Sequence, residues 1–113
     1  MAARFAKSAR LRRRSEFESL LRHGRRQSDS CFTVITLPST LDMPRLGLVV
    51  PKKQVPLAVE RNRIKRIVRE SFRLQQHALP NLDIAVMARA GCSKRGNPEL
   101  RTSLTQHWQR LAR

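Results

Sequence analysis

The densest group of residues that could bind a ligand lies within residues 57–76, LAVERNRIKRIVRESFRLQQ. At about 100° per residue, a helix over this stretch gathers one polar and basic side, made of Arg61, Asn62, Lys65, Arg66, Arg69 and Arg73. The i, i+4 spacing along that side stacks like charges, which costs roughly a few tenths of a kcal/mol per neighbouring pair. A solvated helix face gains nothing from this repulsion, whereas a face that binds a polyanion does. The pattern therefore favours phosphate binding.

The opposite side of the same stretch predicts a buried helix face. Ile64, Ile67, Val68, Ser71 and Leu74 fall together with Phe72 at the edge, a stripe wide enough to pack on a sheet. No glycine or proline interrupts the stretch, so we predict a single long helix.

Composition supports a polyanionic partner. The 113 residues contain 24 Lys and Arg against 8 Asp and Glu, a formal net charge of +16. A chain of this length forms one domain, predicted to span residues 1–113, with a flexible basic arm over residues 1–9. Nucleic acid is favoured over a membrane, because no apolar run approaches the ~20 residues of a spanning helix.

The remaining reactive side chains do not form a recognisable catalytic or metal site. Cys31 and Cys92 are far apart, and a reduced cytoplasmic protein is the simplest interpretation, with a disulfide between them as the alternative. The three histidines are scattered without metal-ligand spacing, and the carboxylates do not cluster as in a two-metal nuclease. We predict no catalytic residue and no metal site in the protein itself.

Around the long helix, the sequence predicts further helices and strands. Ser15 and Glu18 form a capping box that predicts a helix start, and Gly24 is placed for a left-handed C-terminal cap. Strands are predicted over residues 31–37, 45–50 and 83–89, and a last helix from Asn97 with an apolar stripe. This order indicates an α+β two-layer sandwich of helices on a sheet.

The segment RNRIKRIVRESF at residues 61–72, with PKK at residues 51–53, resembles the arginine-rich signature of the bacterial ribonuclease P protein component. A looser similarity extends from about Arg10 to Leu111. The resemblance implies a central mixed sheet of about four strands packed by three helices. It places the additional strand within residues 25–37, which we read as one bent or split strand. It also implies a left-handed βαβ crossover through the long helix, against the general preference for right-handed crossovers.

The same resemblance implies a function. In that family the protein joins a catalytic RNA, binds the 5′ leader of precursor tRNA and assists magnesium-dependent removal of the leader, which produces the mature 5′ end. The chain would then be the non-catalytic, monomeric protein subunit of a cytoplasmic ribonucleoprotein endonuclease. Magnesium would be held mainly by the RNA and the substrate.

Two sets of site residues follow. RNA contacts are assigned to the helix and to the lysine pair before it, namely Lys52, Lys53, Arg61, Asn62, Arg63, Lys65, Arg66, Arg69 and Arg73, with Arg63 on the flank of the basic side. Leader contacts are assigned to Phe17, Leu21, Phe32 and Ile35. Leu21 and Ile35 stand where family members often carry aromatic rings, and the chain has no Tyr, so leader binding should depend mainly on charge. Core packing is an equally good interpretation of Phe17.

Two other classes of protein were weighed. A ribosomal-type structural RNA-binding protein would be equally basic, yet it would take no part in cleavage. A helix-turn-helix DNA regulator needs two short consecutive helices, whereas strands flank the long helix here.

Overall fold

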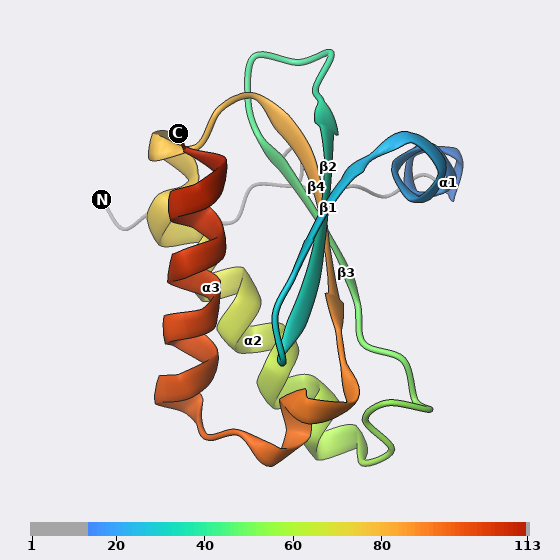
Figure 1. The fold of residues 1–113 in the computed structure, drawn as a ribbon, viewed down its shortest axis with the longest axis vertical. Coiled ribbons are helices and arrows are strands. Elements are labelled where there is room, and N and C mark those ends of the chain that lie inside the picture. Colours follow the sequence, from blue (N-terminus) through green and yellow to red (C-terminus); the bar gives the residue numbers. More distant parts are fainter. Residues whose placement is uncertain (1–13, 113) are drawn as a thin grey trace.

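The computed structural model describes residues 14–112, and the predicted basic arm over residues 1–9 lies outside them (Figure 1). Three helices, four strands and two short 3-10 turns follow in the order α1 (Arg14–His23), β1 (Arg25–Ser28), β2 (Phe32–Pro38), β3 (Arg45–Val49), α2 (Ala58–Gln75), η2 (Gln76–Ala78), β4 (Leu82–Ala88), η3 (Ala90–Lys94) and α3 (Asn97–Leu111). The α+β class, the long helix and the split of residues 25–37 into two strands are confirmed.

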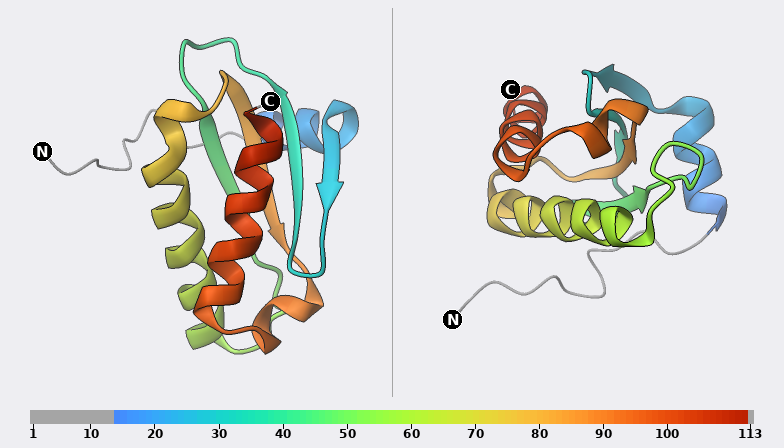
Figure 2. Two further views of the ribbon diagram at one scale, coloured as in Figure 1. Left: turned by 60° about the vertical axis from the view of Figure 1, so that its left-hand side comes forward. Right: turned by 90° about the horizontal axis from the view of Figure 1, so that it is seen from below.

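The four strands form one mixed sheet in the order β1-β2-β4-β3. β2 pairs antiparallel with β1 and β4, whereas β3 runs parallel to β4, with Leu46 opposite Ile84. The chain leaves β3, returns through α2 and enters β4 beside it, and the views in Figures 1 and 2 give this βαβ crossover a left hand. The implied exception to the right-handed preference is therefore present.

The helices divide between the two faces of the sheet. α2 and α3 lie side by side on one face, and α1 lies on the other (Figures 1 and 2). The core divides accordingly into a main cluster under α2 and α3 and a small cluster of Leu20, Ile35 and Ala85 under α1. The two-layer expectation therefore holds for α2 and α3, while α1 adds a partial layer on the opposite face.

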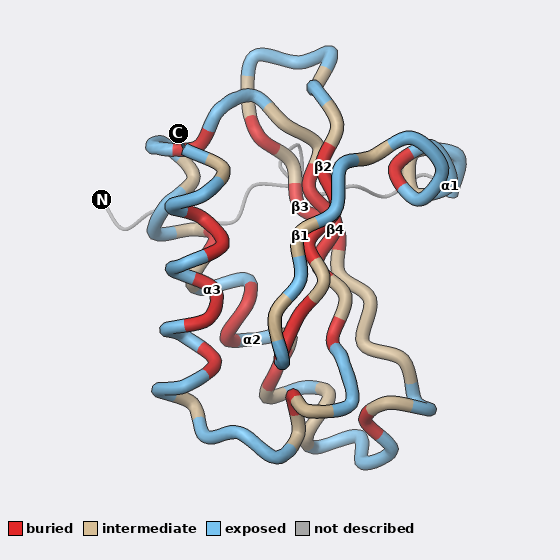
Figure 3. The backbone as a smooth tube through the Cα atoms, in the orientation of Figure 1, coloured by how far each residue is buried: buried red, intermediate tan, exposed pale blue. Residues whose placement is uncertain are grey.

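The main core joins α2 to α3 and to the sheet, and buried residues line both helices where they face it (Figure 3). The Phe72 and Trp108 rings meet edge to face at 6.1 Å, and Trp108 Nε1 donates to Ser71 Oγ at 2.8 Å. Leu74 was expected on this buried face, but it is 64% exposed and lines a groove between α2 and α3. Cys31 and Cys92 are both buried and free, so the disulfide alternative is wrong.

The predicted boundaries of α1 need correction. The helix begins at Arg14, so Ser15 lies in its first turn, and the Glu18 carboxylate accepts from Arg14 Nε at 3.2 Å. Gly24 has no positive φ, so the predicted left-handed cap is wrong. Glycine is required there for a different reason, because a Cβ atom would clash with the Ile35 side chain and the Leu20 carbonyl oxygen.

Candidate nucleic-acid interface

The outer face of α2 carries a row of polar and basic side chains, which we call the α2 ridge: Asn62, Lys65, Arg66, Arg69 and Arg73. Asn62, Arg66 and Arg69 are exposed, and the other two are half-buried. Together with Glu70 they line an open depression of about 510 Å³. Because Ile64, Ile67 and Val68 anchor the opposite side of α2 in the core, the ridge is held facing outward.

Three cations of the ridge are left without protein partners. Among residues 14–112, Lys65, Arg66 and Arg69 form no ion pair and no side-chain hydrogen bond. Glu70 is the one acidic residue of this depression and the other charged residues that line it are cations, so their charges add to one local positive potential. Such a surface suits the regularly spaced phosphates of a nucleic acid.

Arg61, at the foot of this row, contributes to the loop before α2. Its Nη1 donates to the carbonyl oxygens of Val55 at 3.0 Å and Pro56 at 2.7 Å. Val55 is fully buried and fixes the same loop in the core, while Lys52 and Lys53 remain exposed on its turn. A guanidinium has five donor hydrogens, so Arg61 can hold the loop and still offer hydrogen bonds outward.

Arg63 differs from the other predicted RNA ligands. Its guanidinium contacts the Glu60 carboxylate at 2.7 Å, Asn97 Oδ1 at 2.6 Å and the Arg95 carbonyl oxygen at 3.2 Å. As predicted, Arg63 lies on the flank of the basic side and not among the ridge residues. The structure shows what the sequence did not, namely that this side chain faces the beginning of α3.

The four predicted leader residues do not share one surface. Phe17 is half-buried with its ring over Gly47, Leu21 is 41% exposed, and Ile35 is fully buried beneath α1. Phe32 is fully buried in the main core, because residues 32 and 35 of one strand point to opposite faces of the sheet. Phe32 therefore presents no surface on the α1 side, which corrects its grouping with the other three.

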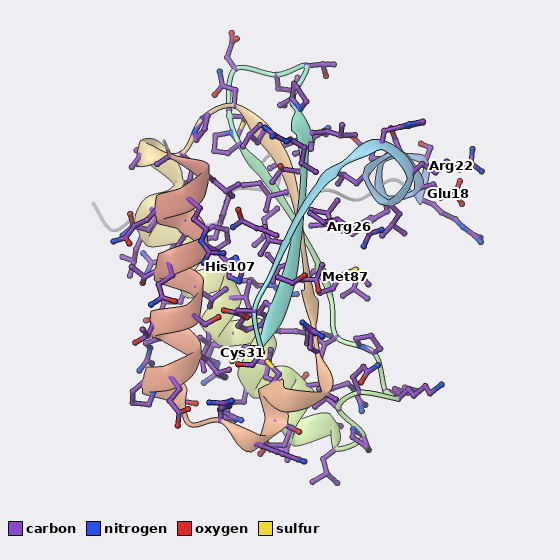
Figure 4. The ribbon with its side chains drawn as sticks, in the orientation of Figure 1. Glu18, Arg22, Arg26, Cys31, Met87 and His107 are labelled. Atoms are coloured by element: carbon purple, nitrogen blue, oxygen red, sulfur yellow. The ribbon has the colours of Figure 1, made fainter. Side chains whose placement is uncertain are left out.

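The α1 side of the sheet offers two residues that the sequence analysis missed. Arg26 and Met87 lie on this side next to α1 (Figure 4). Arg26 is exposed and donates to the Leu21 carbonyl oxygen at 3.1 Å, and Met87 is a half-buried member of the cluster under α1. Residues 83–89 were read as a strand covered on both faces. No residue type in this run marks the face as partly open, because Met is common in protein cores.

A network of charges fixes α1 to the sheet edge. Arg45 on β3 donates to both carboxylate oxygens of Asp83 on β4, at 2.8 and 2.9 Å, and pairs with Glu16 on α1 at 2.5 Å. The hydrogen bonds that Arg45 donates to Asp83, reinforced by its pairing with Glu16, raise the pKa of Arg45 above its usual value despite partial burial. All three side chains are largely shielded from water, so the pairing is structural.

Metal ligands do not cluster in the part of the chain that the structure describes. Residues 14–112 contain no group of three or more His, Cys, Asp or Glu side chains placed to hold an ion. Among the same residues, no helix is both long enough and apolar enough to cross a membrane.

A mixed sheet that supports an arginine-rich helix with unpaired cations defines an α+β protein of the nucleic-acid-binding class. The family model described as Ribonuclease P matches residues 5–112. The chain belongs to the bacterial ribonuclease P protein family.

Relatives and solved structures agree on this family. The ribonuclease P protein component of Methylococcus capsulatus is 45% identical over 109 residues, covering 96% of this chain and 85% of the relative. That of Photobacterium profundum is 42% identical over 109 residues, covering 96% and 92%. The RNase P protein of Staphylococcus aureus superposes with a TM-score of 0.86 at 30% identity, covering 95% of this chain and 97% of that one. The Thermotoga maritima protein gives 0.80 at 32%, covering 89% and 96%.

Proposed function

We propose that this chain is the protein subunit of ribonuclease P, which binds the catalytic RNA and assists removal of the 5′ leader from precursor tRNA. The observation that carries this proposal is the row of unpaired cations on α2. Three like charges on one rigid helix are unfavourable in the free protein and become favourable against RNA phosphates. Lys52 and Lys53, exposed on the loop that Arg61 holds, extend the same surface.

In this proposal the RNA subunit, and not the protein, carries out the cleavage reaction. The protein side chains near the α2 ridge can neutralise phosphate charge and orient the RNA backbone, but they include no carboxylate cluster within residues 14–112 that would fit magnesium. In this proposal, magnesium is assigned to the RNA and the substrate. The protein favours the folded, close-packed RNA by reducing repulsion between its phosphates.

The leader is assigned to the α1 side of the sheet. Phe17 and Leu21 supply apolar surface there, and Arg26 and Met87 adjoin it. Phe17 is the single ring among these four, so stacking of bases is limited and charge carries much of the affinity. The protein is assigned to the cytoplasm as a monomer that joins one RNA.

The test is cleavage of precursor tRNA by a bacterial ribonuclease P RNA at low magnesium, with and without the protein. We expect the wild-type protein to restore cleavage. The Lys65→Ala/Arg69→Ala protein should bind the RNA roughly 10- to 50-fold more weakly at physiological salt, with the salt slope reduced by about two. Arg61 is left intact, because its loss would also release the loop before α2.

A matched control removes two charges elsewhere. Arg101 and Arg110 are exposed cations on α3, and the Arg101→Ala/Arg110→Ala protein should behave almost as wild type. If the wild-type protein binds the RNA tightly while cleavage is indifferent to it, the ribosomal-type alternative replaces this proposal.

A further inference from the structure

The turn η3 and the end of β4 carry cations that the α2 ridge does not account for. We propose that Arg89 and Lys94 form a second RNA-contact surface, and that Arg63 is a positioning residue which holds this turn beside the beginning of α2. The expected ligand is the phosphate backbone of the same RNA. This inference rests on the proposed function and extends it to a part of the chain outside the α2 ridge.

Arg63 links α2 to the segment that follows η3. One nitrogen donates to Asn97 Oδ1 at 2.6 Å, a second donates to the Arg95 carbonyl oxygen at 3.2 Å, and Glu60 binds the same guanidinium at 2.7 Å. The carboxylate and the two neutral acceptors take up four of the five donor hydrogens of the Arg63 guanidinium. Its position therefore fixes residues 95–97, rather than offering a charge to solvent.

Three further contacts make the turn rigid. Cys92 is fully buried in the main core, and the Arg89 backbone N–H donates to the Cys31 carbonyl oxygen at 2.9 Å. Gly91 lies so close to the β1–β2 hairpin that a Cβ atom would sit 2.7 Å from the Ser30 carbonyl oxygen. A turn held in this way fixes the backbone positions from which Arg89 and Lys94 project, which lowers the entropy cost of binding.

The charges on this turn are not neutralised. Lys94 is exposed and forms no ion pair among residues 14–112, and Arg89 is exposed and donates from Nη1 to the Asp29 carbonyl oxygen at 2.7 Å, which carries no charge. The neighbouring acids are already occupied. Glu60 pairs with Arg63, Glu99 pairs with Arg95, and the Asp29 carboxylate accepts from the Cys31 and Phe32 amides and from Ser103.

The placement of the turn allows both surfaces to meet one RNA. η3 lies at the end of the molecule where α2 and α3 begin (Figures 1 and 2). The α2 ridge runs away from that end along the helix. A backbone that follows the ridge toward the beginning of α2 therefore reaches the neighbourhood of Lys94 and Arg89. Contacts of this kind add affinity without selecting a base sequence.

The experiment measures the affinity of the full-length protein for ribonuclease P RNA as a function of salt. We expect Arg89→Ala/Lys94→Ala to reduce the salt slope by about two and to weaken binding roughly 10- to 50-fold at physiological salt. The Arg101→Ala/Arg110→Ala protein loses the same charge on α3, and its slope should match wild type.

The positioning role of Arg63 is tested through its partner. Asn97→Ala breaks the contact without changing the net charge, and it should weaken binding several-fold in the wild-type background. In the Arg89→Ala/Lys94→Ala background, the same change should have almost no effect, because the contacts that it positions are gone. Arg63→Lys should also weaken binding, since an ammonium keeps the charge but cannot span both acceptors.

Opposite outcomes would overturn the inference in distinguishable ways. An unchanged salt slope in Arg89→Ala/Lys94→Ala removes the turn from the RNA interface. Full binding by Arg63→Lys, or an equal effect of Asn97→Ala in both backgrounds, shows that Arg63 does not act by positioning this surface. Failure of the wild-type protein to bind the RNA would instead reject the proposed function. Thermal unfolding of each variant confirms that the protein is folded at the binding temperature.

Discussion

Two regions of the molecule use the same kinds of charged residue in opposite ways. On the outer face of α2, the exposed Arg66 and Arg69 and the half-buried Lys65 have no ion-pair partner among the described residues. At the sheet edge under α1, Arg45 is largely shielded and is enclosed by Glu16 and Asp83. Arginine fixes structure where carboxylates surround it, and it remains available to a ligand where they are absent.

The difference follows from desolvation. A cation withdrawn from water requires a partner, and removing that partner leaves an uncompensated buried charge. A cation in water requires none, and its removal costs the fold little. Stability measurements can therefore separate structural from ligand-binding cations before any RNA is added.

The largest effect is expected at Arg45. Arg45→Met keeps the aliphatic stem but leaves the Asp83 and Glu16 carboxylates without their cation. We expect the free energy of unfolding, measured with urea, to fall by about 2 kcal/mol, which is below the roughly 3 to 5 kcal/mol of a fully buried pair because some water reaches this site. Arg66→Met on the ridge is the matched control and should stay within about 0.5 kcal/mol of wild type. Equal losses in the two variants would break the distinction.

A second buried polar cluster predicts a pH dependence. Burial lowers the pKa of His107, and the Asp29 charge opposes this shift only in part. The ring is 1% exposed, with Gln27 Nε2 donating to its Nδ1 at 2.8 Å, while Nε2 lies 3.2 Å from Asp29 Oδ2 in poor geometry for a hydrogen bond. Ser103 also binds Asp29, and Arg110 disfavours a protonated ring. The folded protein therefore keeps this histidine neutral to lower pH than the unfolded chain does.

The sign follows from proton uptake. As pH falls from about 7 toward 5, the unfolded chain protonates its histidine near the usual value of about 6.5 before the folded protein does, so stability declines. Unfolding free energies across this range should show the decline, and His107→Gln should reduce it. Burial raises the pKa of Asp29, but the hydrogen bonds from Ser103 and from the Phe32 and Cys31 amides outweigh this effect. The pKa of Asp29 is therefore lowered overall. Its contribution is lost only near pH 4 and below. A slope that is identical in the variant would assign the dependence to other groups.

The smallest effect has the opposite sign. Lys65→Ala/Arg69→Ala removes like-charge neighbours from α2 and introduces good helix formers, so the protein should become more stable by a few tenths of a kcal/mol per neighbouring pair at low salt. Thermal unfolding in low and high salt measures this gain, which should shrink as salt screens the repulsion. A clear loss of stability would mean that these cations also support the fold.

The sequence predicted α2 well because its apolar and basic residues follow one period over many turns. Short elements were less predictable. The β1–β2 turn contains no glycine. The Asp29 carboxylate closes it by accepting from the amides of Cys31 and Phe32 at 2.8 Å each. A lone aspartate between serines is a weak signal of that arrangement.

The residues of the candidate site also differ in how well the sequence predicts them. Helical periodicity placed the unpaired cations of α2 on one face, since that depends only on local geometry. The role of Arg63 depends on Asn97 and Arg95, which are more than thirty positions away in the chain. The face of the sheet on which Phe32 lies depends on strand register. Contacts between distant segments determine both, and no local pattern contains them.

The close contact between the Phe17 ring and Gly47 restricts which residues can occupy these two positions in the family. A Cβ atom at position 47 would lie too close to Cζ of the Phe17 ring for both to keep their places. Any homologue that gains a side chain at position 47 must therefore carry a smaller or displaced residue at position 17, although thirty positions separate them. Across an alignment, the two columns should change together, and a glycine at one should accompany an aromatic ring at the other.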